Sequence, residues 1–347
     1  AFMYLQNYYM QNTPLGYDKD EIIITNMNNN IRKSRDAFAS QVKSFSGIEE
    51  VTYAEMLLSS QDQYMGWGRK YRDKDIQFQC LPVEPSFLKV MNVKISEGRD
   101  FREEDKAKRY GTFVFNERAR TEYGLEIGSL IDSMEIVGFM PDVKFASFRT
   151  EVTPMAFFVW GTNNWGNQPN YAYIKVKAGS DLRGAMQHVK TTLQSFDPEY
   201  PFNVRFFDEV FNGLYEKERS LSSLITLFSL IAIFISVVGV FGLVVFDSEY
   251  RKKEIGIRKV LGSTTEEIIV MFNKTYIRIL CVCFVLGAPI AGYVVHRWLE
   301  NFAYKTPMYW WVYLIAFAII AVITILTVTF QNWRAANENP VHSIKNE

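Results

Sequence analysis

Three long stretches of this chain contain no Asp, Glu, Lys or Arg, and they constrain its fold more than any other feature. They cover residues 221–246, 279–295 and 306–333, which are 26, 17 and 28 residues long. A helix needs about 20 apolar residues to cross a hydrocarbon core of about 30 Å. The alternative is three buried helices of a soluble core, but such helices rarely lack charge over this length. We therefore expect three membrane-spanning helices.

The second stretch is the shortest and needs its flanks to cross a bilayer. A span from Thr275 to Trp298 is long enough if Arg278 and Arg297 extend their charged ends toward the interfaces. Pro289 lies within this span and is expected to kink the helix. Neighbouring helices can accommodate such a kink by covering the freed carbonyl.

The overall composition hides this division. The 347 residues carry 38 basic and 38 acidic side chains, and a zero net charge argues against nucleic-acid binding, which usually requires a basic excess. Residues 1–220 hold 27 basic and 30 acidic groups, a net charge of −3, whereas residues 221–347 hold 11 and 8, a net charge of +3. The neutral total is thus a cancellation between two different parts of the chain.

The basic residues predict the orientation in the membrane. The link 247–278 carries seven of them, five within residues 251–259, whereas the link 296–305 carries two. Cytoplasmic loops of membrane proteins are enriched in Lys and Arg, so we expect the first link and the C-terminal tail to be cytoplasmic. Residues up to about 220 then lie on the outer side.

An outer domain of about 220 residues must be exported by a signal peptide or an upstream membrane helix. Neither is visible in the opening sequence, AFMYLQNYYMQNTPLGY. We expect residues 1–9 to be the outer end of a truncated first membrane helix, so that the whole protein would have at least four spans. The alternative is that these residues form the first strand or helix of the outer domain.

Residues 18–220 are expected to form a mixed α/β (α+β) domain of two lobes. Runs of β-branched residues and alternating apolar residues predict strands, and a helical apolar period predicts helices. The expected strands are 21–25, 51–58, 77–83, 112–115, 134–139, 171–177 and 204–207, and the expected helices are 30–46 and 181–196.

We find no catalytic motif in the sequence. Gly-x-Ser-x-Gly, His-Glu-x-x-His and the phosphate-binding loop Gly-x-x-x-x-Gly-Lys-Ser/Thr are all missing. Cys80 is expected to be a buried core residue, and Cys281 and Cys283 project to different sides of a helix, which is unsuitable for a metal site. The sequence thus predicts a protein that is not an enzyme and has no catalytic, cofactor-binding or metal-binding residues.

The segment 249–269, EYRKKEIGIRKVLGSTTEEII, predicts a helix, a tight turn and a second helix along the membrane surface. Gly262 allows the break, and Ser263 or Thr264 can cap the second helix with Glu266 or Glu267. The apolar residues are Ile257, Val260 and Leu261 before the break and Ile268, Ile269 and Phe272 after it. Two interpretations stay open: a basic collar on anionic lipid, or a docking element for a cytoplasmic partner.

Residues 251–262, RKKEIGIRKVLG, resemble the cytoplasmic signature of the FtsX/MacB-type ABC transporter permeases. The C-terminal sequence AANENPV followed by IKNE resembles the ending of this family, and the order of a large outer domain followed by three spans is similar too. The outer domain resembles the MacB-like periplasmic domain, with Glu97-Gly98-Arg99-x-Phe101 and Asn116-Glu117 as weaker matches. This family has a further membrane helix just before its outer domain, in keeping with the expected truncation.

The resemblance, which covers essentially the whole chain, implies a periplasmic domain and a helical membrane domain. The expected boundaries are 1–17 for the end of the truncated helix, 18–220 for the periplasmic domain, 221–246, 277–298 and 309–331 for the spans, 247–276 for a cytoplasmic coupling loop, 299–308 for an outer loop and 332–347 for a cytoplasmic tail.

The resemblance also implies the membrane subunit of an efflux or lipoprotein-releasing complex in the bacterial inner membrane. Its partners would be a cytoplasmic ATPase that binds ATP, a second permease copy or fused half, and a periplasmic adaptor or substrate. Movement of the ATPase would act on the coupling residues, which are Arg251, Glu254, Ile257, Arg258, Lys259, Leu261 and Gly262. The alternatives are an ATP-gated regulator of cell-wall hydrolases or signalling, and a membrane-anchored receptor or adhesion domain without an ATPase. The sequence does not indicate the cargo.

Overall fold

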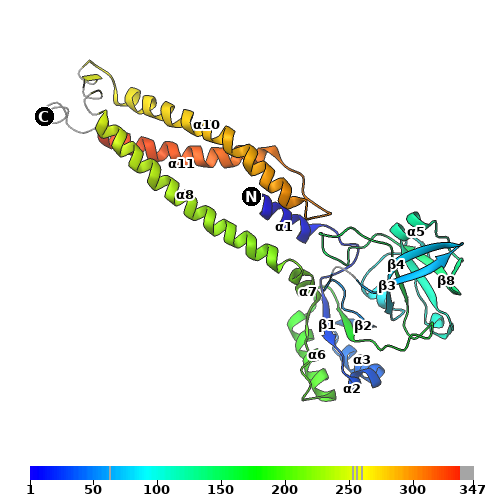
Figure 1. Cartoon of the computed structure of the whole chain (residues 1–347). Coiled ribbons are helices and arrows are strands. Elements are labelled where there is room, and N and C mark those ends of the chain that lie inside the picture. Colours follow the sequence, from blue (N-terminus) through cyan, green and yellow to red (C-terminus); the bar gives the residue numbers. More distant parts are fainter. Residues whose placement is uncertain (62–63, 252–253, 255–256, 259–260, 337–347) are drawn as a thin grey trace. The chain divides into compact units, whose positions relative to one another are not determined.

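The computed structural model describes residues 1–61, 64–251, 254, 257–258 and 261–336. It divides into two compact units, a helical unit and an α/β domain (Figure 1). The helical unit comprises Ala1–Gln11, Glu218–Asn301 and Lys305–Glu347, and the α/β domain comprises Asn12–Lys217 together with Phe302–Tyr304.

The helices of the helical unit that the structure describes in full are α1 (Phe2–Asn12), α8 (Glu216–Tyr250), α10 (Thr265–Leu299) and α11 (Trp310–Ala336). The last three contain segments long and apolar enough to cross a membrane, namely Glu216–Asp247, Thr265–Leu299 and Trp310–Trp333. α10 and α11 pack along each other, as Figure 1 shows. α10 continues as one helix through Pro289.

Helix α1 belongs to the helical unit, where it packs beside the start of α11. The side-chain oxygen of Gln6 accepts a hydrogen bond of 2.7 Å from the backbone N–H of Thr306, and the rings of Phe2 and Tyr313 lie 5.5 Å apart. The first residues of the chain are therefore helical and contact the third candidate span.

The α/β domain is built on one mixed sheet with the strand order β11-β1-β10-β2-β4-β9-β6-β8-β5, with β3 beside β4 and β7 beside β8. The strands are β1 (Ile22–Asn26), β2 (Ile48–Ala54), β3 (Gly66–Tyr71), β4 (Lys74–Val83), β5 (Glu97–Gly98), β6 (Thr112–Asn116), β7 (Leu130–Ile131), β8 (Met134–Met140), β9 (Met155–Val159), β10 (Tyr171–Val176) and β11 (Arg205–Phe206). The helices are α2 (Asn29–Lys33), α3 (Arg35–Lys43), α4 (Phe87–Val90), the 3₁₀ helix η1 (Glu103–Ala107), α5 (Glu117–Tyr123), α6 (Leu182–Phe196) and α7 (Phe207–Gly213). The β4–β9 and β6–β8 pairs are parallel, and the other pairs are antiparallel.

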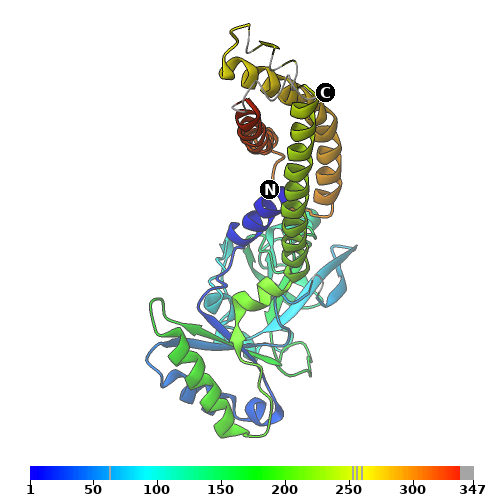
Figure 2. The same ribbon diagram turned by 90° about the vertical axis from the view of Figure 1, so that its left-hand side faces the viewer.

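Two hydrophobic clusters of the described residues, one in each half of the sheet, confirm the expected two-lobed α/β domain. In the first lobe, α2, α3 and α6 pack together on β1, β10 and β2 (Figure 2), and the core includes Phe38, Ile174 and Val189. In the second lobe, the core lies among β3, β4, β6, β8, β9 and α5 and includes Phe113 and Phe158.

The lobes are joined by little sheet structure. β2 and β4 share a single residue pair, Ala54 and Val83. Next to it, the carboxylate of Glu84, whose side chain is 12% exposed, contacts Arg35 of the first lobe at 3.3 Å and Lys106 of the second at 2.9 Å. The lobes therefore share one sheet contact and one carboxylate, and the ring of Phe87 also packs between Phe157 of β9 and Tyr173 of β10.

Several elements differ from those expected from the sequence. The helix expected at 30–46 is two helices, because Asn28 caps α2 and the chain breaks at Ser34 before α3. The strand expected at 204–207 ends at Phe206, where α7 begins with Asp208 and Glu209 in its first turn, a position that favours acidic residues. The strands β3, β5, β7 and β9 were not expected. β9 is a short run buried on both faces, so its sequence shows no alternation.

Two glycines allow the backbones of the paired strands β5 and β8 to lie close together. Gly98 pairs with Gly138, and its φ of +82° is unfavourable for a residue with a Cβ atom. A Cβ atom at position 138 would lie 2.3 Å from the backbone oxygen of Arg99. The backbone of Arg99 thus occupies the space of a side chain at position 138.

Gly138→Ala is expected to lower the stability of the α/β domain by about 1–3 kcal/mol, because the backbone of Arg99 must move to admit the methyl group. Thermal unfolding of the full chain in detergent, followed by tryptophan fluorescence, measures this. Gly166→Ala is the control, since a Cβ atom there meets nothing within 4 Å. Equal unfolding temperatures for the two variants would show that the backbone of Arg99 does not pack against position 138 as described.

Candidate functional site

The connection between α8 and α10 contains the residues expected to couple the spans to a partner. The structure describes Arg251, Glu254, Ile257, Arg258, Leu261 and Gly262, whereas Lys259 lies outside the described residues. We call the described residues 257–264 the connecting turn.

The connecting turn is closed by backbone hydrogen bonds. The N–H of Leu261 donates to the carbonyl of Ile257 at 3.0 Å, and the N–H of Ser263 donates to that of Arg258 at 2.9 Å. Gly262 has a φ of +97°, a left-handed conformation that favours glycine. The helical segment that includes Ile257 and Arg258 therefore ends before Gly262, where the backbone turns.

Helix α10 begins directly after the connecting turn with a capping box. The N–H of Glu267 donates to the hydroxyl of Thr264 at 3.3 Å, and the N–H of Thr264 donates to the carboxylate of Glu267 at 3.0 Å. This arrangement satisfies two free N–H groups at the helix start. Of the caps considered from the sequence, the structure uses Thr264 and Glu267.

Two ion pairs hold basic residues near the connecting turn. Arg251 contacts Asp247 at 2.9 Å, and its guanidinium lies 5.9 Å from the ring centroid of Phe272. Arg258 contacts Glu254, one helical turn earlier, at 2.7 Å, and both side chains remain partly exposed. Arg251 therefore joins α8 to α10. Arg258 also donates a hydrogen bond to the sulfur of Met271 in α10, and its side chain stays partly exposed.

The apolar residues around the connecting turn fall into a buried and an exposed group. Ile268 and Phe272 are 2% exposed and pack with Val244 of α8 and Val328 of α11. Ile257 and Leu261 are 51% and 81% exposed. The start of α10 is thus anchored among the helices, while the connecting turn presents two apolar side chains outward.

A segment not singled out in the sequence contributes to the α/β domain. Phe302 and Tyr304 follow α10 in the chain and pack against the loop between β8 and β9. The N–H of Tyr304 donates to the carbonyl of Phe148 at 3.1 Å, and the tyrosine hydroxyl accepts from the N–H of Val152 at 3.2 Å. In the sequence, the sign of this packing is that two aromatic residues, Phe302 and Tyr304, lie in a short loop.

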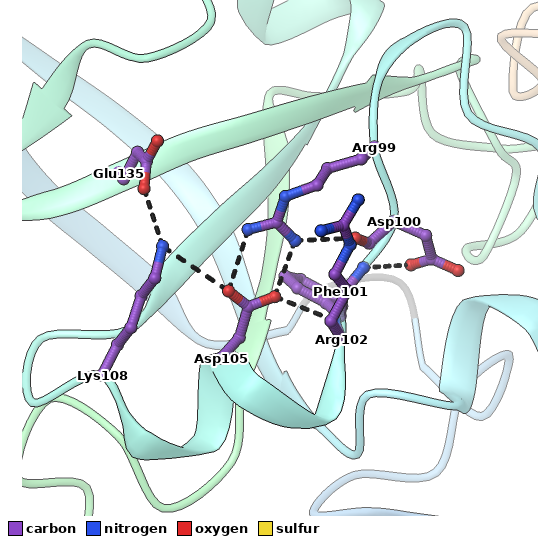
Figure 3. Close-up of polar contacts among 7 residues, drawn as sticks. All are labelled: Arg99, Asp100, Phe101, Arg102, Asp105, Lys108 and Glu135. Carbon is purple, nitrogen blue, oxygen red and sulfur yellow. Dashed lines mark hydrogen bonds and ion pairs between the residues drawn. The ribbon is translucent and has the colours of Figure 1, made fainter.

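The Glu97-Gly98-Arg99-x-Phe101 motif forms a charged cluster in the second lobe (Figure 3). Arg99 donates two hydrogen bonds to Asp105, at 2.7 and 2.9 Å, and the N–H of Arg102 donates a third at 2.8 Å. Lys108 lies 3.6 Å from Asp105 and 2.8 Å from Glu135. Asp105 itself is 1% exposed, so this cluster braces the chain after β5 and has no free group for chemistry.

Burial and hydrogen bonding shift the two aspartate pKa values of this cluster in opposite directions. Burial would raise the pKa of Asp105, but the hydrogen bonds from Arg99 and the Arg102 N–H outweigh it, and the pKa lies below its usual value. Burial raises the pKa of Asp100 to about 6, although the N–H of Phe101 donates to its carboxylate. Asp100 is therefore partly protonated near neutral pH.

The cysteine considered from the sequence in the α/β domain is a core residue. Cys80 is fully buried, as expected, and burial raises the pKa of its thiol well above the usual value. Among the described residues, no group of three His, Cys, Asp or Glu side chains converges as metal ligands would.

Two family models match the chain. The MacB-like periplasmic core domain matches residues 7–192, which is more than half of the chain, and the FtsX-like permease C-terminal domain matches residues 226–340. The two matches cover the α/β domain and the long helices in turn.

Two curated relatives are similar to this chain over more than half of its length. The macrolide export ATP-binding/permease protein MacB of Chromobacterium violaceum is 23% identical over 230 residues, and that of Escherichia coli K12 is 22% identical over 233 residues. Each alignment covers 63% of this chain and 35% of the relative, so the chain spans about a third of the length of these relatives.

Among solved structures, the periplasmic region of MacB from Actinobacillus actinomycetemcomitans aligns with a TM-score of 0.42 and 14% identity, covering 58% of this chain and 95% of that structure. The extracellular domain of the transporter YknZ from Gram-positive bacteria aligns with a TM-score of 0.38 and 12% identity, covering 53% and 99%.

Asp105→Asn is expected to lower the stability of the α/β domain by about 2–3 kcal/mol, because the partly buried guanidinium of Arg99 loses its counter-charge. Thermal unfolding of the full chain in detergent tests this. Asp132→Asn is the matched control, since it removes an aspartate that is 56% exposed and contacts Arg69 at 3.0 Å, and a change of less than about 1 kcal/mol is expected. An Asp105→Asn variant as stable as this control would contradict the bracing role.

Asp100→Asn is expected to stabilise the protein at pH 8 but not at pH 4. The pKa of Asp100 is about 6 in the folded protein, above its usual value of 3.8, so folding favours the protonated form. The contribution of Asp100 to the stability of the wild type is therefore lost as the pH rises from about 4 through about 6, whereas a neutral asparagine does not titrate. Unfolding temperatures measured across this range should diverge, and a constant difference between variant and wild type would contradict the raised pKa.

Proposed function

This chain belongs to the family of FtsX/MacB-type ABC transporter permeases, and we propose that it transmits movement from an ATP-hydrolysing partner to its α/β domain. The three candidate spans would lie in the bacterial inner membrane, with the α/β domain in the periplasm and the connecting turn in the cytoplasm. The 347 residues contain no phosphate-binding loop, so ATP would be bound elsewhere in the complex.

Helix α10 carries this proposal because it joins the two places where movement would enter and leave. It runs for 35 residues, about 50 Å, from the connecting turn to the residues just before Phe302. Phe302 and Tyr304 then pack in the α/β domain through the contacts with Phe148 and Val152. A displacement of the connecting turn would move α10 along its length and act on the loop between β8 and β9.

The connecting turn has the chemistry of a docking element. Leu261 and Ile257 offer exposed apolar groups that would enter a groove on the ATPase, beside the partly exposed guanidinium of Arg258. Burying a leucine of this kind contributes about 2 kcal/mol, or roughly 30-fold in affinity. The buried Ile268 and Phe272 would hold the start of α10 so that the force is not lost in local bending.

We favour export as the task of the complex because the two curated relatives, each aligned to 63% of this chain, are named as macrolide export proteins. The complex would contain a second permease, either an identical chain or a fused half, and a periplasmic adaptor that receives the cargo.

The combined substitution Arg258→Glu with Leu261→Asp is expected to abolish retention of the ATPase when the full-length protein is purified from its own membranes in detergent. It replaces an exposed positive charge by a negative one and puts a carboxylate in the proposed groove. The measurements are the amount of co-purified ATPase and the ATP hydrolysis rate per permease, and both should fall at least tenfold.

The matched control makes the same exchanges on helix α6, as Leu182→Asp with Lys190→Glu, where both residues are exposed. It should retain the ATPase. If the connecting-turn variant unfolds at the wild-type temperature and also keeps the ATPase, the docking role of this turn is wrong.

A further inference from the structure

A small cavity lies within the α/β domain, between the loop that joins β8 to β9 and the side chain of Tyr304. Its volume is about 200 Å³, and its lining includes Tyr64, Lys144, Phe145, Met155 and Tyr304. The lining is mixed: Phe145 and Met155 are buried core residues, whereas Gln79, Ser147, Thr150, Glu151 and Thr153 contribute polar groups. Every residue of the lining belongs to the α/β domain.

Lys144 is the basic group of this cavity. Its ammonium nitrogen lies 4.5 Å from the ring centroid of Tyr304 and 5.0 Å from that of Phe148. Partial burial lowers the pKa of Lys144, which shows that the charge has lost part of its hydration. Aromatic faces offset this loss only in part.

Two other lysines of the domain, Lys175 and Lys106, have carboxylate partners, whereas no described acidic residue pairs with Lys144. Lys175 contacts Asp18 at 2.8 Å, and Lys106 contacts Glu84 at 2.9 Å. Among the described residues, no ion pair includes Lys144, and no acidic group contributes to the shift of its pKa. Its charge is therefore available to an anionic group that enters the cavity.

The size of the cavity limits the molecule that fits. A dry apolar cavity of about 150 Å³ is large enough for a benzene molecule. The walls made by Phe145 and Met155 would surround an apolar group of this size, and the Lys144 ammonium would lie beside it. We propose that this cavity binds a small amphipathic carboxylate, with an apolar group about as large as an aromatic ring and its carboxylate against Lys144.

This inference does not rest on the proposed export function, because binding to the cavity can be measured without ATP or a partner. The probe is N-acetyl-4-fluorophenylalanine, an aromatic group beside a carboxylate, and the comparison compound is its uncharged amide. Each is titrated with the full chain in detergent and observed by fluorine NMR, with protein-free micelles as the blank.

The acid is expected to bind saturably and at least fivefold more tightly than the amide. Lys144→Met, which keeps the length of the side chain but removes the charge, should weaken binding of the acid roughly tenfold and leave binding of the amide unchanged. Lys190→Met, on the exposed side of α6, should alter neither. Tyr304→Ala removes a wall of the cavity and should weaken both compounds.

Three results would overturn the proposal: no saturable binding of the acid to the wild type, equal affinities for acid and amide, or a Lys144→Met variant that binds the acid as well as the wild type does. The first two need no substitution, so the test holds even if Lys144→Met fails to fold. Loss of ATPase retention in the connecting-turn variant would leave all of these results unchanged.

Discussion

A backbone amide inside a bilayer has no water to bond with, so each charge-free stretch has to satisfy its hydrogen bonds within one helix. This requirement makes α8, α10 and α11 long and uninterrupted. It also makes them stiff, because successive turns are joined by hydrogen bonds, except where Pro289 of α10 has no N–H to donate. The α/β domain and the connecting turn lie at the ends of these helices along the chain, and α10 joins the two.

The parts of the structure that were predictable depend on local chemistry. An absence of charge over 26 or 28 residues predicts a span without knowledge of its neighbours, and Thr264 followed by Glu267 predicts a capping box from three residues of spacing. Tyr173 and Ile174 lie in strand β10, and aromatic and β-branched residues such as these favour the strand conformation.

The parts that were not predictable depend on partners distant in the sequence. Tyr304 meets Phe148 across 156 positions, and nothing in the loop itself identifies that partner. Arg99 was recognised as part of a motif, but its partner Asp105 became apparent only when η1 brought the carboxylate under the guanidinium. The candidate docking residues were predictable in part. Their spacing predicts a helix and a turn, but the exposure of Leu261 is apparent only from the structure.

Pro289 gives α10 an uneven stiffness. Proline has no N–H, so the carbonyl of Val285 loses its helical partner and the helix is easiest to bend there. The joint divides α10 into a long arm of 24 residues, about 36 Å, on the side of the connecting turn and a short arm of 10 residues, about 15 Å, on the side of Phe302. With the long arm anchored by Ile268 and Phe272, a small change of angle at Pro289 would swing the short arm and tilt Tyr304 within its loop. One missing hydrogen bond would thus let the two segments of α10 change their angle at Pro289.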